Sequence, residues 1–304
     1  MTIMKMRALV VGASGRLGSK IVHELLALGA TVRVTHRAGS NPEQVAKLRA
    51  TGAELVTADL SDEASLLRAC EGIDVVVSSV QGLRDTIVDG QTRLLRAAEK
   101  ARVARMIPSD YSLDFHKTTK GGNRSSDTRR EFNRVLDTSS VRGTSLLCGA
   151  FMDLLLWGAF GPDAKTGVYK VWGDENQPYD FTSTDDVAKY AAAVALDADA
   201  GRVVRVVGDV VSPQKLAKVF EEVRGVKVTI EHLGSLDELE RTIDKLRAAD
   251  EAKTNVFPVW QQLQYARDMA SGLGNLSPLD NDRYPSIRPQ AVGAFLRAQS
   301  KPVE

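Results

Sequence analysis

The feature that most constrains the fold is a glycine-rich turn near the start of the chain. The segment GASGRLG, residues 12–18, follows an apolar, β-branched run and leads into a stretch of helical periodicity at 16–28. A strand that passes through glycines spaced three apart into a helix is typical of the first βα unit of a Rossmann-type fold. In that unit Gly12 takes the tight turn, Gly15 permits close backbone approach, and Gly18 lets the helix pack on the strand.

The rest of the first half repeats this alternation of strand and helix. Strands are predicted at 6–11, 31–35, 54–60, 74–80, 104–108 and 144–149, and further helices at 43–49, 63–70, 86–100 and 129–137. Six strands that alternate with helices predict an α/β protein with a Rossmann-type, doubly wound parallel sheet and helices on both faces.

The glycine turn also predicts a site for a pyrophosphate. The first turn of a helix presents N–H groups and the positive end of the helix dipole to an anion. The residues expected to bind a dinucleotide there are Gly12, Ser14, Gly15, Arg16, Leu17 and Gly18.

The end of the second strand predicts which dinucleotide binds. NAD-selective sites carry an acidic residue about 20 residues after the glycines. Here the strand ends in His36 and Arg37, and the next acidic residue is Glu43. Because Arg37 can pair with a phosphate through two hydrogen bonds, and Arg16 can approach the same group, the sequence favours NADP(H) over NAD.

Other strand ends complete the predicted cofactor site. Asp59 follows the third strand and is expected to accept a hydrogen bond from the adenine amino group, while Leu60 covers the ring. The remaining predicted contacts are Ser78, Ser79 and Val80 after the fourth strand, and Gly149, Ala150 and Phe151 after the sixth. The apolar residues from Phe151 to Trp157 suit a flat aromatic substrate, although ordinary core packing explains them equally well.

The second half is less regular. Strands are predicted at 168–172, 203–207 and 226–230, and helices at 184–196, 213–223, 236–246, 260–271 and 290–298. We therefore expect an NADP-binding domain at 1–150 and a smaller α+β lobe for substrate or partner at 151–304, with the two able to interleave.

Composition excludes several classes of function. Lys and Arg total 40 against 39 Asp and Glu, and this near-neutral balance argues against a nucleic-acid partner. Two cysteines make no disulfide framework, and four dispersed histidines show no metal-ligand spacing. No signal-peptide pattern or membrane-spanning run is present, so we expect a cytoplasmic protein without a metal or a membrane contact.

The motifs GASGRLG, TADLSD, VVVSSVQG and RMIPSDYSLDF resemble those of the NmrA-like and isoflavone-reductase-like family of atypical short-chain dehydrogenases. The segments TSTDDVAKY, VVGDVVSPQKLAKVF and PLDNDRYPSI extend the resemblance over nearly the whole chain. The resemblance implies one of two activities: an NADPH-dependent reductase of aromatic substrates, or a regulator that binds the dinucleotide without turnover and contacts another protein.

The expected catalytic lysines are missing. No tyrosine is followed four residues later by lysine, so the Tyr-x-x-x-Lys pair of ordinary short-chain dehydrogenases is absent. The resemblance also implies a lysine near the start of the helix after the fifth strand, where this sequence has Arg130 and Glu131. Arginine keeps the positive charge but is a poor general acid. Thr128 and Glu131 fit a capping box, which favours a structural role for Glu131.

Three residues remain as catalytic candidates. Tyr111 follows the fifth strand, Lys117 lies in the basic loop after it, and Arg130 can polarise a carbonyl or hold an anion. We expect an NADPH-dependent reductase of a small aromatic, quinone or carbonyl substrate, and a quinone needs little proton transfer from the protein. The alternative is a non-catalytic, NADP-sensing regulatory protein that binds a protein partner.

Overall fold

The computed structural model describes residues 5–299, which divide into two compact units. Of the described residues, the first unit comprises 5–111, 128–146 and 187–204. The second comprises 112–127, 147–186 and 205–299. The chain thus passes between the units several times.

The first unit contains a six-stranded parallel sheet. Its elements are β1 (Arg7–Val11), α1 (Arg16–Ala27), β2 (Thr31–His36), α2 (Pro42–Ala50), β3 (Glu54–Thr57), α3 (Glu63–Cys70), β4 (Val75–Ser78), α4 (Gln91–Lys100), β5 (Arg105–Ile107) and β6 (Arg142–Gly143). A π-helical segment, η1 (Asp85–Gly90), leads directly into α4. Helix α5 (Arg124–Asp137) begins in the second unit and continues in the first.

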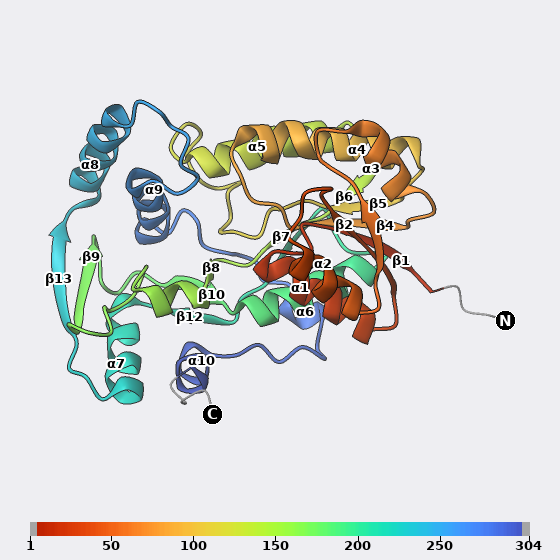
Figure 1. Ribbon diagram of the computed structural model, residues 1–304. Coiled ribbons are helices and arrows are strands. Elements are labelled where there is room, and N and C mark those ends of the chain that lie inside the picture. Colours follow the sequence, from red (N-terminus) through yellow and green to blue (C-terminus); the bar gives the residue numbers. More distant parts are fainter. Residues whose placement is uncertain (1–4, 300–304) are drawn as a thin grey trace. The chain divides into compact units, whose positions relative to one another are not determined.

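The strand order in this sheet is β3-β2-β1-β4-β5-β6, and every neighbouring pair is parallel. The order reverses between β1 and β4, and in such sheets ligands bind beyond the carboxyl ends of the strands at that point. Figure 1 shows α1 and α2 on one face of the sheet and α3 and α4 on the other. The predicted Rossmann-type, doubly wound α/β fold is therefore confirmed.

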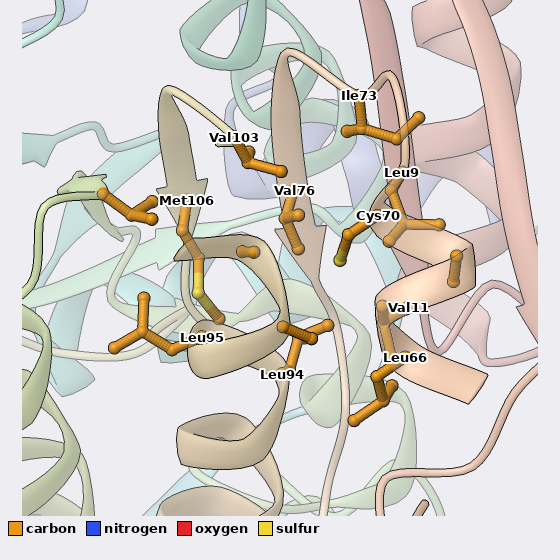
Figure 2. Packing of buried hydrophobic residues seen from close by; sticks show 14 of the residues in the cluster. Leu9, Val11, Leu66, Cys70, Ile73, Val76, Leu94, Leu95, Val103 and Met106 are labelled. Atoms are coloured by element: carbon orange, nitrogen blue, oxygen red, sulfur yellow. The ribbon is translucent and has the colours of Figure 1, made fainter. Parts of the chain in front are cut away.

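One hydrophobic cluster of this unit lies between the sheet and the helices α3 and α4 (Figure 2). Leu9 of β1, Val76 of β4 and Met106 of β5 are fully buried. They pack in one cluster with Leu66 of α3 and Leu94 of α4. Each such side chain contributes about 1.5–3 kcal/mol through burial, so this cluster anchors the strand ends that carry the predicted site.

Two buried arginines on the strands hold the carboxyl ends of helices. Arg33 of β2 donates from Nη1 to the Ala69 carbonyl at the end of α3, at 2.9 Å. Arg105 of β5 donates from Nη1 to the carbonyls of Ala195 and Asp197, at 3.1 and 2.6 Å, at the end of α6 (Thr184–Leu196). Carbonyls in the last turn of a helix lack a partner within that helix, so each arginine supplies a donor there. The Asp197 carbonyl also accepts a hydrogen bond from the Ala200 amide, at 3.1 Å.

Several small sheets and helices form the remainder of the chain. They are β7 (Ser145–Leu147), β8 (Ala150–Phe151), β9 (Val168–Trp172), β10 (Tyr179–Thr182), β11 (Val203–Arg205), β12 (Asp209–Val211), α7 (Pro213–Arg224), β13 (Thr229–Gly234), α8 (Leu236–Ala249), α9 (Val259–Ala270) and α10 (Val292–Ala298), with short 3₁₀ turns at Met152–Trp157 and Asn281–Arg283. The strands pair as β12-β10-β8, β11-β7 and β13-β9. Among the described helices, none has both the length and the apolar character needed to cross a bilayer.

The prediction of a sixth sheet strand at 144–149 is wrong. The sixth strand is β6, and the chain changes partner directly after it: the Thr144 amide donates to Met106, whereas the Ser145 amide donates to Arg202. Residues 145–147 then pair with β11, and Ala150–Phe151 pairs with β10. An apolar run suits either sheet equally well, so its composition does not reveal the switch.

The predicted start of α5 at residue 129 is also wrong. The helix begins at Arg124, because the side-chain oxygen of Asn123 accepts hydrogen bonds from the amides of Ser125 and Ser126. Thr128 therefore lies inside the helix, and the capping box proposed for it does not form.

Candidate functional site

The glycine turn brings β1, α1 and the end of β4 into close contact. Gly12 has a φ of +86°, which glycine adopts without strain. A Cβ atom added to Gly18 would lie 2.2 Å from the Gly12 carbonyl oxygen and 2.5 Å from Ser79 Oγ. Ser79 Oγ itself donates to the Val11 carbonyl at 3.1 Å. We call Gly12, Gly15, Gly18 and Ser79 the glycine cradle. The glycine turn, the start of α1 and the end of β4 can approach this closely only because the glycines carry no side chain.

The cradle leads into the exposed beginning of α1. Gly15 is the N-cap residue, and among the described residues no side chain caps the helix and no acid occurs in its first turn. Ser14, Gly15 and Arg16 are exposed. Backbone N–H groups and the positive end of the helix dipole therefore face solvent beside a cationic side chain, which is the chemistry that an anionic pyrophosphate requires.

The end of β2 presents cationic and polar groups. Arg37 is exposed, and its backbone amide donates to Ser40 Oγ at 3.0 Å, which closes the turn after the strand. His36 Nε2 lies 3.3 Å from Thr57 Oγ1 on the neighbouring strand β3. The turn fixes the backbone of Arg37 at the strand end, and its exposed guanidinium together with His36 offers donors that fit a phosphate on the adenosine ribose.

Asp59 follows β3 and stays ionised. Its Oδ1 accepts hydrogen bonds from the side chain and the amide of Ser61, at 2.6 and 2.8 Å. These bonds hold the pKa of Asp59 below its usual range, and the positive charges of Arg37 and Arg93 add to the effect. The carboxylate thus lies within the electrostatic reach of Arg37, while Leu60 next to it is half-buried.

At the end of β4, Ser78 is fully buried, and Ser79 and Val80 are half-buried. Ser109 Oγ donates to the Val80 carbonyl at 2.6 Å. The chain after β4 is thereby tied to the end of β5, so both segments are fixed at the carboxyl edge of the sheet.

Of the predicted catalytic residues, Tyr111 and Arg130 belong to the first unit and Lys117 to the second. Tyr111 is buried, with 7% of its surface exposed. The Lys117 ammonium donates to the carbonyls of Asn275 and Ser277, at 3.1 and 3.0 Å, and lies 3.7 Å from the buried Asp114 carboxylate. Lys117 must break these contacts before it can transfer a proton. The catalytic roles of Tyr111, Lys117 and Arg130 stay predictions.

Gly149, Ala150 and Phe151 belong to the second unit. Gly149 has a φ of +68°, and a Cβ atom there would lie 2.3 Å from the Asp180 carbonyl oxygen. Ala150 and Phe151 form β8 and pair with Phe181 and Thr182. Within its own unit this segment is therefore fixed by sheet pairing, and its predicted cofactor contacts stay predictions.

A buried carboxyl group beside Tyr111 escaped the sequence reasoning. Asp110 is fully buried, and its Oδ2 accepts hydrogen bonds from Asn133 Nδ2 and Ser145 Oγ, at 2.8 and 2.7 Å. Burial raises the pKa of Asp110, and these hydrogen bonds only partly offset it. Asp110, Asn133 and Ser145 are far apart in sequence, so no short motif predicts their contact. The one sequence feature that points to a buried polar group here is Ser109-Asp110 directly after a buried strand.

Residues 5–299 contain no group of three or more His, Cys, Asp or Glu side chains placed to hold a metal ion. Both cysteines are buried free thiols. The carboxyl edge of the sheet in the first unit instead carries backbone donors and the exposed cations Arg16 and Arg37, beside the carboxylate of Asp59. The donors and cations suit an elongated anionic ligand.

The strand order and the glycine cradle define a Rossmann-type α/β protein. The chain belongs to the NmrA-like family, whose model matches residues 4–275. The resemblance inferred from the motifs is therefore confirmed.

The chain is similar to several plant reductases. The chain is 32% identical to pinoresinol reductase 2 of Arabidopsis thaliana over 210 residues, which are 64% of this chain and 65% of that protein. The match thus spans just under two thirds of the relative's length. Among solved structures, AtPrR2 with NADP+ and (+)pinoresinol is similar with a TM-score of 0.80 at 24% identity, covering 97% of this chain and 98% of that one. Isoflavone reductase gives 0.82 at 18%, covering 97% and 100%. Likeness at these identities shows the shared fold.

Proposed function

We propose that the protein is an NADPH-dependent reductase of a small aromatic substrate. The observation that carries this proposal is the glycine cradle at the uncapped start of α1, with Arg37 rather than an acid at the end of β2. An acid there would repel a 2′-phosphate, whereas an exposed guanidinium attracts it.

The residues of the first unit fit NADPH along its length. The turn from Gly12 to Gly18 would hold the pyrophosphate, and His36 with Arg37 the 2′-phosphate. Asp59 and Leu60 would contact the adenine, and the segment Ser78–Val80 would pass the ribose and nicotinamide. Bound NADPH supplies a hydride. The proposed cofactor domain spans 1–150 and the proposed substrate lobe spans 151–304, with the two able to interleave.

An aromatic substrate is proposed because the relatives include pinoresinol reductases and the AtPrR2 structure contains pinoresinol. The segment from Phe151 to Trp157 supplies apolar side chains of matching chemistry. Arg130 would polarise the substrate oxygen, and Tyr111 or Lys117 would deliver the proton.

The experiment is a measurement of NADPH binding by fluorescence, followed by NADPH oxidation with quinones, aromatic aldehydes, enones and lignans of the pinoresinol type. We expect binding together with oxidation that depends on at least one of these substrates. Binding without oxidation on the whole panel overturns the reductase and favours the NADP-sensing regulator. Absence of NADPH binding overturns the cofactor assignment itself.

A further inference from the structure

The junction between η1 and α4 lies against the loop that follows β3. The last residue of η1 is Gly90, and a Cβ atom there would lie 3.2 Å from Leu60 Cδ1. Leu60 therefore packs so closely against the start of α4 that a side chain at position 90 would push it away. π-helical turns are rare and are often found at functional sites.

Arg93, the third residue of α4, bonds to the same loop. Its Nε donates to the Leu60 carbonyl oxygen at 2.5 Å. Its positive charge also helps to hold the pKa of Asp59 below the usual range, after the larger effect of the Ser61 hydrogen bonds. Arg93 thus bonds to the backbone of Leu60 and favours the ionised form of Asp59, the two residues predicted to contact the adenine.

The opposite side of the same helix is fixed to the segment that follows β5. Gln91 is fully buried, its Nε2 donates to the Ile87 carbonyl at 2.7 Å, and its Oε1 accepts from the Ser109 amide at 3.0 Å. Residues two apart on a helix point in nearly opposite directions, about 200° around the axis. Gln91 therefore anchors the helix to the sheet, and Arg93 reaches from that anchored helix to the loop at Leu60.

We propose that Arg93 is a positioning residue for the adenosine half of NADPH, acting by holding the Asp59–Ser61 loop through the Leu60 carbonyl. This inference rests on the proposed function, since it assumes that this loop contacts the adenine. Loss of the bond frees the loop, so binding the adenosine half must then also cover the cost of ordering it. The nicotinamide half binds elsewhere along the sheet edge and is unaffected.

The test compares Arg93→Met with Arg96→Met. The first substitution keeps the aliphatic stem but removes the hydrogen bond, and the second removes the same charge from an exposed position on the same helix. Binding of NADPH, 2′,5′-ADP, ADP and reduced nicotinamide mononucleotide is measured by calorimetry, and the melting temperature of each ligand-free protein is recorded.

We expect Arg93→Met to weaken NADPH, 2′,5′-ADP and ADP by about tenfold each, the effect of losing one charge-assisted hydrogen bond. Affinity for the mononucleotide stays within twofold, and Arg96→Met leaves all four unchanged. A loss confined to ligands with a 2′-phosphate means direct phosphate contact and overturns the positioning role. Equal affinities in the wild type and Arg93→Met, or a uniform loss for all four ligands, also overturn it. If the wild type binds neither NADPH nor 2′,5′-ADP, the proposed function itself fails.

Discussion

The side-chain amide of Asn133 donates a 2.8 Å hydrogen bond to Oδ2 of Asp110, which joins α5 to the end of β5. Ser145 Oγ donates to the same oxygen, and among the described residues no group donates to Oδ1. Both donors thus act on one oxygen of a fully buried carboxyl group. The other oxygen is free to carry a proton, which agrees with the raised pKa of Asp110.

This raised pKa predicts a particular pH dependence of stability. An unfolded aspartate loses its proton near pH 4, whereas folded Asp110 retains it to higher pH. The folded state then binds more protons than the unfolded state, so the contribution of Asp110 to stability falls as pH rises above about 4. Asp110→Asn removes this loss. Urea unfolding from pH 4 to 7 should show the variant gaining stability relative to the wild type as pH rises. Parallel curves for the two proteins contradict the prediction.

Gly18→Ala should disrupt the glycine cradle. The added methyl group would lie 2.2 Å from the Gly12 carbonyl oxygen, which is backbone and can yield only by moving the turn. We expect a loss of about 1–3 kcal/mol in the free energy of unfolding and a drop in NADPH affinity of at least tenfold. The control is Gly201→Ala, where the nearest atom is 3.7 Å away and both properties should be unchanged. Undiminished NADPH affinity in Gly18→Ala would place the cofactor elsewhere.

The first unit follows from the sequence because its signals are local. The glycine turn, the end of β2 at His36 and the N-cap Asn41 before Pro42 are each specified by neighbouring residues. The sixth strand is different, because Thr144 and Ser145 bond to different strands and nothing in their identity shows which. The position of the sixth strand therefore depends on hydrogen bonds to residues that are distant in sequence.

The same distinction holds for the site. The cradle combines Gly12, Gly15 and Gly18, and a motif of fixed spacing reveals it. The contacts of Asp110 with Asn133 and Ser145, and of Arg93 with Leu60, join residues 23 to 35 positions apart on different elements. No single segment carries such a signal, so these contacts appear only when the fold brings the elements together.

Arg37→Asp should reverse the cofactor preference. The exposed guanidinium at the end of β2 would attract a 2′-phosphate, and a carboxylate there would repel it and bond to a free ribose hydroxyl. We expect NADPH affinity to fall by at least tenfold while NADH affinity stays constant or rises. Titration of both cofactors by fluorescence measures the ratio. An unchanged ratio means that other residues read the phosphate.

Arg105→Met should destabilise the first unit. Buried Arg105 donates to three carbonyls at the end of α6, and the substitution removes its hydrogen bonds to them. We expect a loss of about 2–3 kcal/mol, measured by urea unfolding. Lys100→Met is the comparison, because its ion pair with Glu63 is 3.7 Å long and exposed, and such a pair contributes about 0–1 kcal/mol. If the two variants lose the same free energy of unfolding, Arg105 does not stabilise the protein by capping α6.

Tyr111→Phe tests whether the Tyr111 hydroxyl delivers the proton, independently of hydride transfer from NADPH. Tyr111 directly follows the Asp110 network at the carboxyl end of β5, and phenylalanine preserves its buried ring. If its hydroxyl delivers the proton, kcat for an aldehyde or ketone should fall by about a hundredfold or more, since general acid catalysis contributes that much. A quinone should be affected far less, because its reduced oxygen takes a proton readily from water. NADPH affinity should not change in either case. An unchanged kcat for the aldehyde would remove Tyr111 from the reaction and leave Lys117 or solvent as the donor.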